Sequence, residues 1–459
     1  MSRVRIEVTA ELRVLSPLHI GSGMDRTVDE VLGAAGENKP SRVAAIQRDA
    51  DNRPWLPGST IKGLLRRLGR GEEIDTLVGA ETLVNGLPVF RRGALIVSGA
   101  SLHQPSHATS LPYADRDADA GRGALGPGVF VAAGTRIDRS TGVADASSLR
   151  HDESVAPGAV FPLTLTIEMR GVDAERKCDE QLQVLLELLA TLGREAGWPI
   201  GAGQADGDGR VQLRNGKVSI AKTVLGEDGR MQSRPCKVGL PTLPAPDPAI
   251  RRWALRLDCE GPFAVLDPSW AQQRQSGDQS AALSAQRIGE KEPVLPGASV
   301  AGALRARAAW LAACDARRAG KEPVRDDPSK TYERAKRLNY SSVERLFGLS
   351  GWRGLLEIEV LKMLRPAAPW QVSSVKLDRF SGGPMSGGLF ETAAFLGVQA
   401  LLVLRLRRVP SGDVPTEADV ALAERLIEDL CTNGIMLGHG SNKGFGWFAV
   451  TKEQTDAAS

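Results

Sequence analysis

Apolar and polar residues alternate along several segments of the chain, a pattern typical of half-buried β-strands. The clearest examples are residues 4–15 and 254–265. Residues 93–99 and 161–169 are also predicted strands. Each half of the sequence then ends in a glycine-rich turn followed by a short apolar strand.

Helical periodicity separates these strands. Ile61, Leu64, Leu65 and Leu68 recur at helical spacing after a Leu-Pro-Gly-Ser segment, and Ser59 or Thr60 is the predicted N-cap. A second amphipathic helix is predicted over residues 178–197, ending at Gly197, and a counterpart over 417–434, ending at Gly434. Strands combined with two helices on one face predict an α+β fold of the ferredoxin-like kind.

Three sequence motifs occur twice in the same order, which indicates a duplication. Gly58 and Gly297 lie 239 positions apart, Asp138 and Asp378 lie 240 apart, and Gly203 and Gly440 lie 237 apart. The paired segments are PWLPGSTIKGLLR (54–66) with PVLPGASVAGALR (293–305), RIDRSTG (136–142) with KLDRFSG (376–382), and PIGAGQADGDG (199–209) with MLGHGSNKGFG (436–446). A fourth pair, RRGALIVSG (91–99) and WRGLLEIEV (352–360), keeps the order at an offset of 261, so loops of different length surround it.

The duplication predicts two homologous domains, at residues 1–225 and 251–459. Residues 226–250 between them are the predicted linker. Its last part, LPTLPAPDPAI (240–250), carries four prolines and is typical of a stiff, extended connection. A chain of 459 residues also suits two or three domains better than one.

Charge and cysteine content limit the possible protein classes. The 58 Lys and Arg against 55 Asp and Glu give a net charge of +3, which excludes a polycationic tail but allows a local basic stripe. Five cysteines, none closer than 23 residues to the next, exclude a CxxC metal knuckle and indicate reduced thiols. No apolar run approaches 18 residues, and the N-terminus has no signal-peptide pattern. We expect a cytoplasmic protein without a membrane partner.

The first predicted helix carries a row of cations. Lys62, Arg66 and Arg70 lie four residues apart, opposite the apolar face, with Arg67 beside them and no acid from Ser59 to Arg70. Such a row suits a polyanion backbone, although most charged helix faces are simply solvated. The second half keeps Arg305 and has Ala301 where Lys62 stands.

The glycine-rich turns at 201–209 and 438–446 match neither the dinucleotide fingerprint nor a P-loop. They either bring the backbone close to a sugar-phosphate chain or form tight strand connections. His19 lies in LHIGSG, just after the first predicted strand, and His439 lies in LGHGSNKG. Each suits a general base, an RNA contact or a structural role.

Carboxylates gather in the long loop between Ser22 and Pro54. A loop carboxylate beside a basic groove can activate a ribose hydroxyl or hold a divalent ion, although acids are also ordinary loop residues. No G-x-S-x-G motif and no Cys–His pair indicates a covalent nucleophile. The loop acids are Asp25, Asp29, Glu30, Asp49 and Asp51.

The ordered series LSPLHIGSG, PWLPGSTIKGLLRRL, GALIVSGASL, RIDRSTGVADASSL and GWPIGAGQADGDGRV resembles the repeat-associated mysterious protein (RAMP) superfamily. More narrowly, the chain is similar to the backbone subunits of type III CRISPR effector complexes. The second half repeats the series in weaker form. The resemblance implies tandem RRM-like domains with inserted loops and thumb hairpins.

This resemblance also implies partners and binding residues. The partners are a CRISPR RNA, a target single-stranded RNA and other effector subunits. Residues 137–149 and 377–390 correspond to the thumb region that interrupts guide–target pairing. The residues expected to contact RNA are His19, Ser59, Lys62, Arg66, Arg67, Arg70, Arg139, Gly201, Gly203, Arg305, Arg379, Gly438, His439, Gly440 and Lys443.

Many such subunits cut target RNA with a loop aspartate between the first strand and first helix, aided by Mg²⁺ or another divalent ion. Counted from His19, that position falls near Asp29, which is then the catalytic and metal-binding candidate, with Asp25 second. The nearest acid in the second domain is Asp278. The alternatives are a non-catalytic guide-binding scaffold, or a CRISPR RNA-processing enzyme with His19 as base.

Overall fold

The computed structural model describes most of the chain, and its first sheet is built on one long strand. The described residues are 3–27, 42–69, 71–84, 87–104, 125–126, 128–137, 145, 148–214, 216–225, 230–242, 251–266, 285, 287–288, 292–327, 330–333, 336, 339–407 and 414–453. Strand β1 (Arg3–Val14) alternates as the sequence predicts, with Val4, Ile6, Val8 and Leu12 fully buried on one face. Arg5 and Arg13 point to solvent on the other face.

The first sheet is antiparallel and has the order β12-β13-β1-β11-β7, with β14 and β15 continuing it beside the first half of β1. Helix α4 packs across this sheet and buries Cys178, Leu182 and Leu185, while α2 and α3 cover the rest of the same core. The elements are β7 (Leu95–Val97), β11 (Val160–Arg170), β12 (Trp198–Pro199), β13 (Arg210–Leu213), β14 (Ser219–Leu225), β15 (Met231–Pro235), α2 (Gly58–Leu68), α3 (Glu72–Val78) and α4 (Ala174–Leu192).

The second sheet repeats this arrangement in the order β21-β24-β16-β26-β25. In each half the chain runs strand, helices, strand, strand, helix, strand, and the last strand pairs with the first, which is the split βαβ ferredoxin-like topology. The predicted α+β fold with two tandem domains is therefore confirmed. The elements are β16 (Arg252–Cys259), β21 (Leu356–Met363), β24 (Val398–Leu406), β25 (Ile435–Met436), β26 (Trp447–Lys452), α6 (Gly297–Arg318), α7 (Ser342–Phe347) and α8 (Glu417–Asn433).

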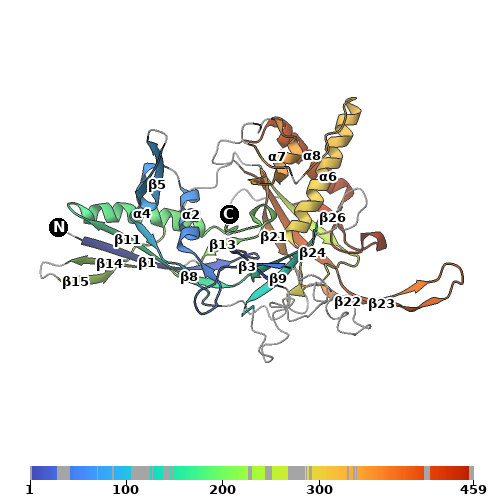
Figure 1. Ribbon diagram of the computed structural model, residues 1–459, viewed down its shortest axis with the longest axis horizontal. Helices are drawn as coiled ribbons and strands as arrows, with labels where there is room; N and C mark the ends of the chain where they lie inside the picture. Colours follow the sequence, from blue (N-terminus) through green and yellow to red (C-terminus); the bar gives the residue numbers. More distant parts are fainter. Residues whose placement is uncertain are drawn as a thin grey trace.

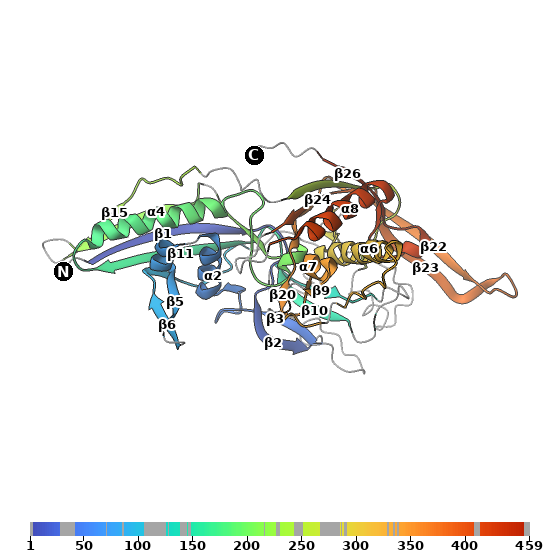
Figure 2. The ribbon, with the colours of Figure 1, turned by 90° about the horizontal axis from the view of Figure 1, so that it is seen from above.

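Inserted segments distinguish the two domains. The first carries a second sheet of order β2-β3-β10-β9, and the second carries a long hairpin, β22–β23, that projects away from the body (Figure 1). Viewed from above, the two domains lie end to end and the hairpin extends beyond the second (Figure 2). The elements are β2 (Gly21–Thr27), β3 (Arg42–Ile46), β4 (Trp55–Leu56), β5 (Gly79–Val84), β6 (Leu87–Arg92), β8 (Ala100–Ser101), β9 (Val129–Gly134), β10 (Arg150–Val155), β17 (Arg287–Ile288), β18 (Glu292–Pro293), β19 (Gly348–Leu349), β20 (Trp352–Arg353), β22 (Ala368–Leu377) and β23 (Pro384–Leu396).

Some predicted helix ends were wrong. Helix α2 begins at Gly58 with Pro57 as N-cap and no side-chain cap, so neither Ser59 nor Thr60 caps it. Helix α4 ends at Leu192, where the Gly193 N–H binds the Leu189 carbonyl, and Gly197 instead lies in the turn before β12. Helix α8 ends at Gly434 as predicted and begins with a Thr416–Asp419 capping box.

The predicted linker only partly lacks regular structure. Strand β15 falls inside residues 226–250 and pairs with β14, so the first sheet extends beyond residue 225. Most of the proline-rich segment, residues 243–250, lies outside the described residues.

Candidate nucleic-acid interface

The cations of α2 lie on its outer face and bind neighbouring carbonyl groups. Lys62 Nζ donates to the Leu95 carbonyl at 3.0 Å, and Arg66 donates to the Gly79 carbonyl. Arg67 donates to the Pro199 carbonyl at 2.5 Å and to Gln204 Oε1 at 3.0 Å. None of these hydrogen-bond partners is an acid, so Lys62 and Arg66 keep their positive charge, whereas Arg67 lies near the charges of Arg353 and Glu357 at the domain contact. Burial, followed by the nearby Arg66 and Arg92, lowers the pKa of Lys62.

Arg305 occupies the place of Arg66 in the second domain but is neutralised there. It forms two hydrogen bonds of 2.7 Å with Asp326 and donates to the Gly348 carbonyl at 2.9 Å. Gly79 and Gly348 each end a short helix with a positive φ. Arg66 and Arg305 therefore share a structural role, and only Arg66 also offers a charge to a polyanion.

His19 contacts the backbone of Glu153, a buried acid that the sequence analysis did not single out. Its Nδ1 lies 2.6 Å from the Glu153 carbonyl oxygen. The Glu153 side chain is fully buried and accepts from Arg26 Nη1 at 3.1 Å, Arg48 Nη2 at 3.2 Å and the Ile46 N–H at 3.1 Å. These contacts join β2, β3 and β10, so Glu153 anchors the small sheet. The burial of Glu153 and its pairing with Arg26 and Arg48 could be found only from the fold, because these residues are far apart in the sequence.

The loop carboxylates do not form a metal centre among the described residues. Asp25 lies on β2, about half exposed, with Arg42 Nη1 at 3.5 Å. Asp29, Asp278, Arg70 and Arg139 lie outside the residues that the structure describes. Within the described ranges no group of three or more His, Cys, Asp or Glu side chains could hold a metal ion. Asp25 alone is too little to do so.

The two glycine-rich turns have the same backbone geometry. A Cβ on Gly201 would lie 2.2 Å from the His19 carbonyl oxygen, and one on Gly438 would lie 2.5 Å from the Ala264 carbonyl oxygen. Gly203 and Gly440 are both left-handed and each precedes a single 3-10 turn. Glycine is needed at Gly201 and Gly438 because a side chain there would collide with the segment that follows the first strand of the same domain.

The surroundings of the two turns differ. Gln204 of the first turn accepts from Arg353 of the second domain at 2.7 Å, so its tip lies between the domains. In the second turn, His439 and Lys443 are exposed. Partial burial of the ring, followed by the charge of Lys443, lowers the pKa of His439.

The β22–β23 hairpin ends in a tight, preorganised tip. Asp378 accepts from the backbone N–H groups of Phe380 and Ser381 at 2.9 and 2.7 Å, and these bonds lower the pKa of its carboxyl. Phe380 is fully exposed at this tip, and Arg379 beside it is also exposed. An aromatic side chain held in solvent by a rigid turn is suited to stacking on a base.

A family model for the RAMP superfamily matches residues 11–212 and 251–449, which together cover most of the chain. The chain belongs to the RAMP superfamily. Each matched region contains most of one of the two ferredoxin-like sheets, and membership indicates a CRISPR-associated role. A search of curated proteins finds no match.

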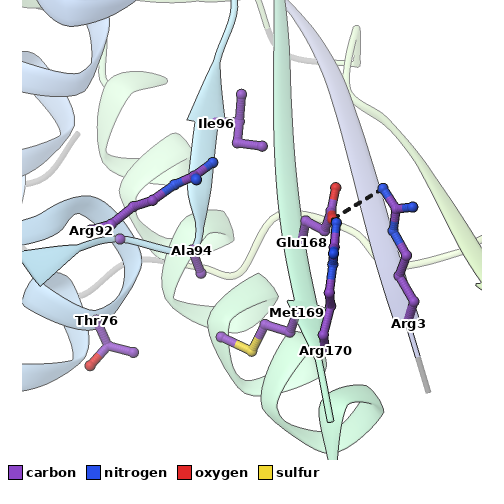
Figure 3. Close-up of a pocket in the computed structure, with 9 residues that line it drawn as sticks. Arg3, Thr76, Arg92, Ala94, Ile96, Glu168, Met169 and Arg170 are labelled. Carbon is purple, nitrogen blue, oxygen red and sulfur yellow. Dashed lines mark hydrogen bonds and ion pairs between the residues drawn. The ribbon is translucent and has the colours of Figure 1, made fainter. Parts of the chain in front are cut away.

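The RAMP domains present one further polar groove, of about 690 Å³, at the edge of the first sheet. Figure 3 shows Arg3 and Arg170 beside Glu168, with Arg92 and Ile96 on the neighbouring segment. Glu168 accepts from Arg3 at 3.1 Å and from Arg170 at 2.8 Å, and these arginines lower its pKa. No predicted site residue lines this groove.

The segment 377–390, predicted from the sequence as a thumb, lies at the end of the β22–β23 hairpin, but sequence reasoning did not single out Phe380. The signal was present, because an aromatic residue between Arg379 and a Ser-Gly-Gly turn has little chance of burial. In the part of the chain that the structure describes, no helix is long and apolar enough to cross a membrane.

Proposed function

We propose that this protein is a CRISPR RNA-binding backbone subunit of a type III effector complex. The observation that carries the proposal is the pair of RAMP domains in series, with a projecting hairpin that holds Arg379 and Phe380 in solvent at its tip. Two domains in one chain suit a long, repetitive ligand, because the second domain repeats the fold of the first one step further along.

We assign different side chains to the phosphates and to the bases of the RNA. Base pairing reads the sequence, while the protein supplies cations for the backbone and an aromatic wedge for the stack. Phe380 is the wedge. The proposed backbone contacts are His19, Ser59, Lys62, Arg66, Arg67, Arg70, Arg139, Gly201, Gly203, Arg379, Gly438 and His439.

We also propose that the first domain cuts the target RNA, with Asp29 as the catalytic and metal-binding residue and Mg²⁺ or another divalent ion as cofactor. Support comes from Asp25, which lies on β2 with an exposed carboxylate and precedes Asp29 by four residues in the sequence. Asp278 is the corresponding candidate of the second domain. The alternative is a scaffold of the same complex that binds RNA without cutting it.

Cleavage of a guide-complementary RNA by the assembled complex tests these proposals. With Mg²⁺, we expect Asp29→Ala to remove one product band while guide RNA stays bound, and EDTA to remove the same band. Asp51→Ala, a matched loss of an exposed loop acid, should leave every band in place. A ladder unchanged by Asp29→Ala, Asp25→Ala and Asp278→Ala would show a non-catalytic scaffold, and loss of guide binding by the wild type would reject both proposals.

A further inference from the structure

The contact between the two RAMP domains joins different surfaces of two similar folds. The first domain contributes its glycine-rich turn, and the second contributes the start of α6 and the edge strand β21. Arg353 Nη1 and Nη2 donate to Gln204 Oε1 at 2.7 Å and to the Gln204 carbonyl at 3.2 Å. Ala205 and Asp206 line one small cavity together with Ala301 and Ile358. Such a head-to-tail contact leaves one copy of each surface unused at the two ends of the pair.

The unused turn is that of the second domain. Its hydrogen bonds repeat those of the first turn: Leu437 N–H binds the Gly446 carbonyl as Ile200 N–H binds that of Gly209. The Lys443 N–H likewise binds the Gly440 carbonyl as Asp206 N–H binds that of Gly203. The second-domain turn therefore has the same backbone conformation as the first-domain turn that docks between the domains. Its residues Ser441 and Lys443 are exposed.

The strands beside this turn expose apolar side chains. Trp447 is 52% exposed and Met436 is 38% exposed, and the two residues pair across β25 and β26. Their counterparts in the first domain are Arg210 and Pro199, which are buried. Arg210 is only 5% exposed because it lies at the domain contact, where it donates to the Ile358 carbonyl at 3.3 Å. A tryptophan exposed at the position of a buried interface residue is typical of an unfilled contact.

The described residues of this chain do not themselves offer a matching surface for that turn. In the second domain a Cβ on Gly297 would lie 1.6 Å from the Asp206 carbonyl oxygen, so the turn fills the space beside α6. In the first domain a Cβ on Gly58 would lie 2.2 Å from the Val97 carbonyl oxygen, so α2 rests directly on β7. The slot that receives the turn in one domain is closed in the other.

The charges at the contact also disfavour a second copy of this chain as the partner of the turn. Lys443 stands where the first turn has Asp206, whose carboxyl faces the positive charges of Arg150 and Arg353. On the first domain, Lys62 and Arg92 take the places of Ala301 and Arg353 and lie close enough to influence one another. A second copy of this chain would set Lys443 against two cations, and like charges at a contact disfavour it.

We propose that the second-domain turn, residues Gly440–Gly444, with Met436 and Trp447, docks onto the edge strand and first helix of a RAMP-type domain in a different chain. That domain has an open slot, an acidic residue at the position of Arg353 and an apolar residue at that of Glu357. The inference rests on the proposed function, since it names a neighbour within the same complex. It assigns the turn to a protein contact rather than to the guide RNA.

The test uses the chain co-expressed with the other subunits of its effector complex. Light scattering of the chain alone should give a monomer. In the complex, Lys443→Glu combined with Trp447→Ala should reduce the co-purified neighbouring subunit at least tenfold, while the guide RNA stays bound. The matched control is Lys321→Glu with Trp310→Ala, since Trp310 is 54% exposed on α6 and Lys321 is exposed just beyond it. This control should retain the full complex.

A photo-crosslinking amino acid at Asn442 identifies what covers the turn. We expect a crosslink to the first helix or edge strand of another subunit's RAMP domain. A crosslink to RNA, a crosslink to a second copy with a dimer mass, or a full complex with the double variant would each overturn the inference and leave the proposed function standing. A wild-type chain that binds neither guide RNA nor any subunit would instead reject the proposed function, and the inference with it.

Discussion

At the scale of single residues, one buried carboxylate holds the small sheet of the first RAMP domain together. Glu153 accepts from Arg26, Arg48 and the Ile46 N–H, so its charge is compensated where no water reaches it. His19, a predicted RNA contact, is held by the backbone of the same residue. The position of this histidine therefore depends on Glu153.

Replacing Glu153 by Gln should lower the free energy of unfolding by about 1–3 kcal/mol, because the two arginines lose their anion while the volume is kept. Urea denaturation measures the change. Asp25→Asn removes an exposed pair with Arg42 and should change stability by less than about 0.5 kcal/mol. Equal effects of the two variants would contradict the role of Glu153.

At the scale of elements, the first glycine-rich turn carries an acid that favours its neutral form. Burial, followed by the charges of Asp206 and Asp152, raises the pKa of Asp208 to about 7. The folded protein therefore binds more protons than the unfolded chain between about pH 4 and 7. The contribution of Asp208 to stability is present at low pH and is lost as the pH rises through 7.

Asp208→Asn keeps the neutral form at every pH. We expect the stability advantage of the variant to grow between pH 5 and pH 8, by on the order of 1–3 kcal/mol, because the wild-type carboxyl ionises over this range. Thermal unfolding across pH 5–8 measures this difference. A constant offset over the whole range would mean that the carboxyl titrates normally.

The tip of the β22–β23 hairpin exposes the Phe380 ring fully to solvent, so this ring does not pack in the core. Phe380→Ala should leave the melting temperature unchanged, since the ring is fully exposed. If Phe380 is the proposed wedge, the variant should also lose an interruption of guide–target pairing at that position. Chemical probing of the RNA duplex in the complex detects the interruption. Leu349→Ala, a buried apolar loss on β19, should lower stability and leave the probing pattern intact. An unaltered pattern with Phe380→Ala would argue against a wedge.

At the scale of the whole molecule, the contact between the domains sets their spacing. Gly297 allows the Asp206 carbonyl to lie against the start of α6, and Arg353 binds Gln204 across the same contact. Glu357, 6% exposed, stands between Arg353 and Arg210, with Arg210 Nη2 at 3.8 Å. Buried, paired charges of this kind fix one arrangement of the two domains better than they add stability.

Gly297→Ala should disrupt this arrangement, because the added methyl group overlaps a backbone oxygen. We expect a loss of about 1–3 kcal/mol and unfolding of the two domains in separate calorimetric transitions. The control is Gly63→Ala in the interior of α2, where a Cβ meets nothing within 4 Å and should stabilise the helix slightly. A single transition with unchanged midpoint in Gly297→Ala would show that the contact is loose.

The sequence by itself determined the duplication, the strand and helix types and the topology, because burial on one face of each element imposes a period that the residues display. It also located the glycine-rich turns and the hairpin segment at residues 377–390, whose glycines mark unusual backbone conformations. Only the tertiary structure decided what the charges do. Arg305 pairs with Asp326, Glu153 joins three strands, and Gln204 lies between the domains. The sequence does not show these pairings because the partners lie far apart along the chain.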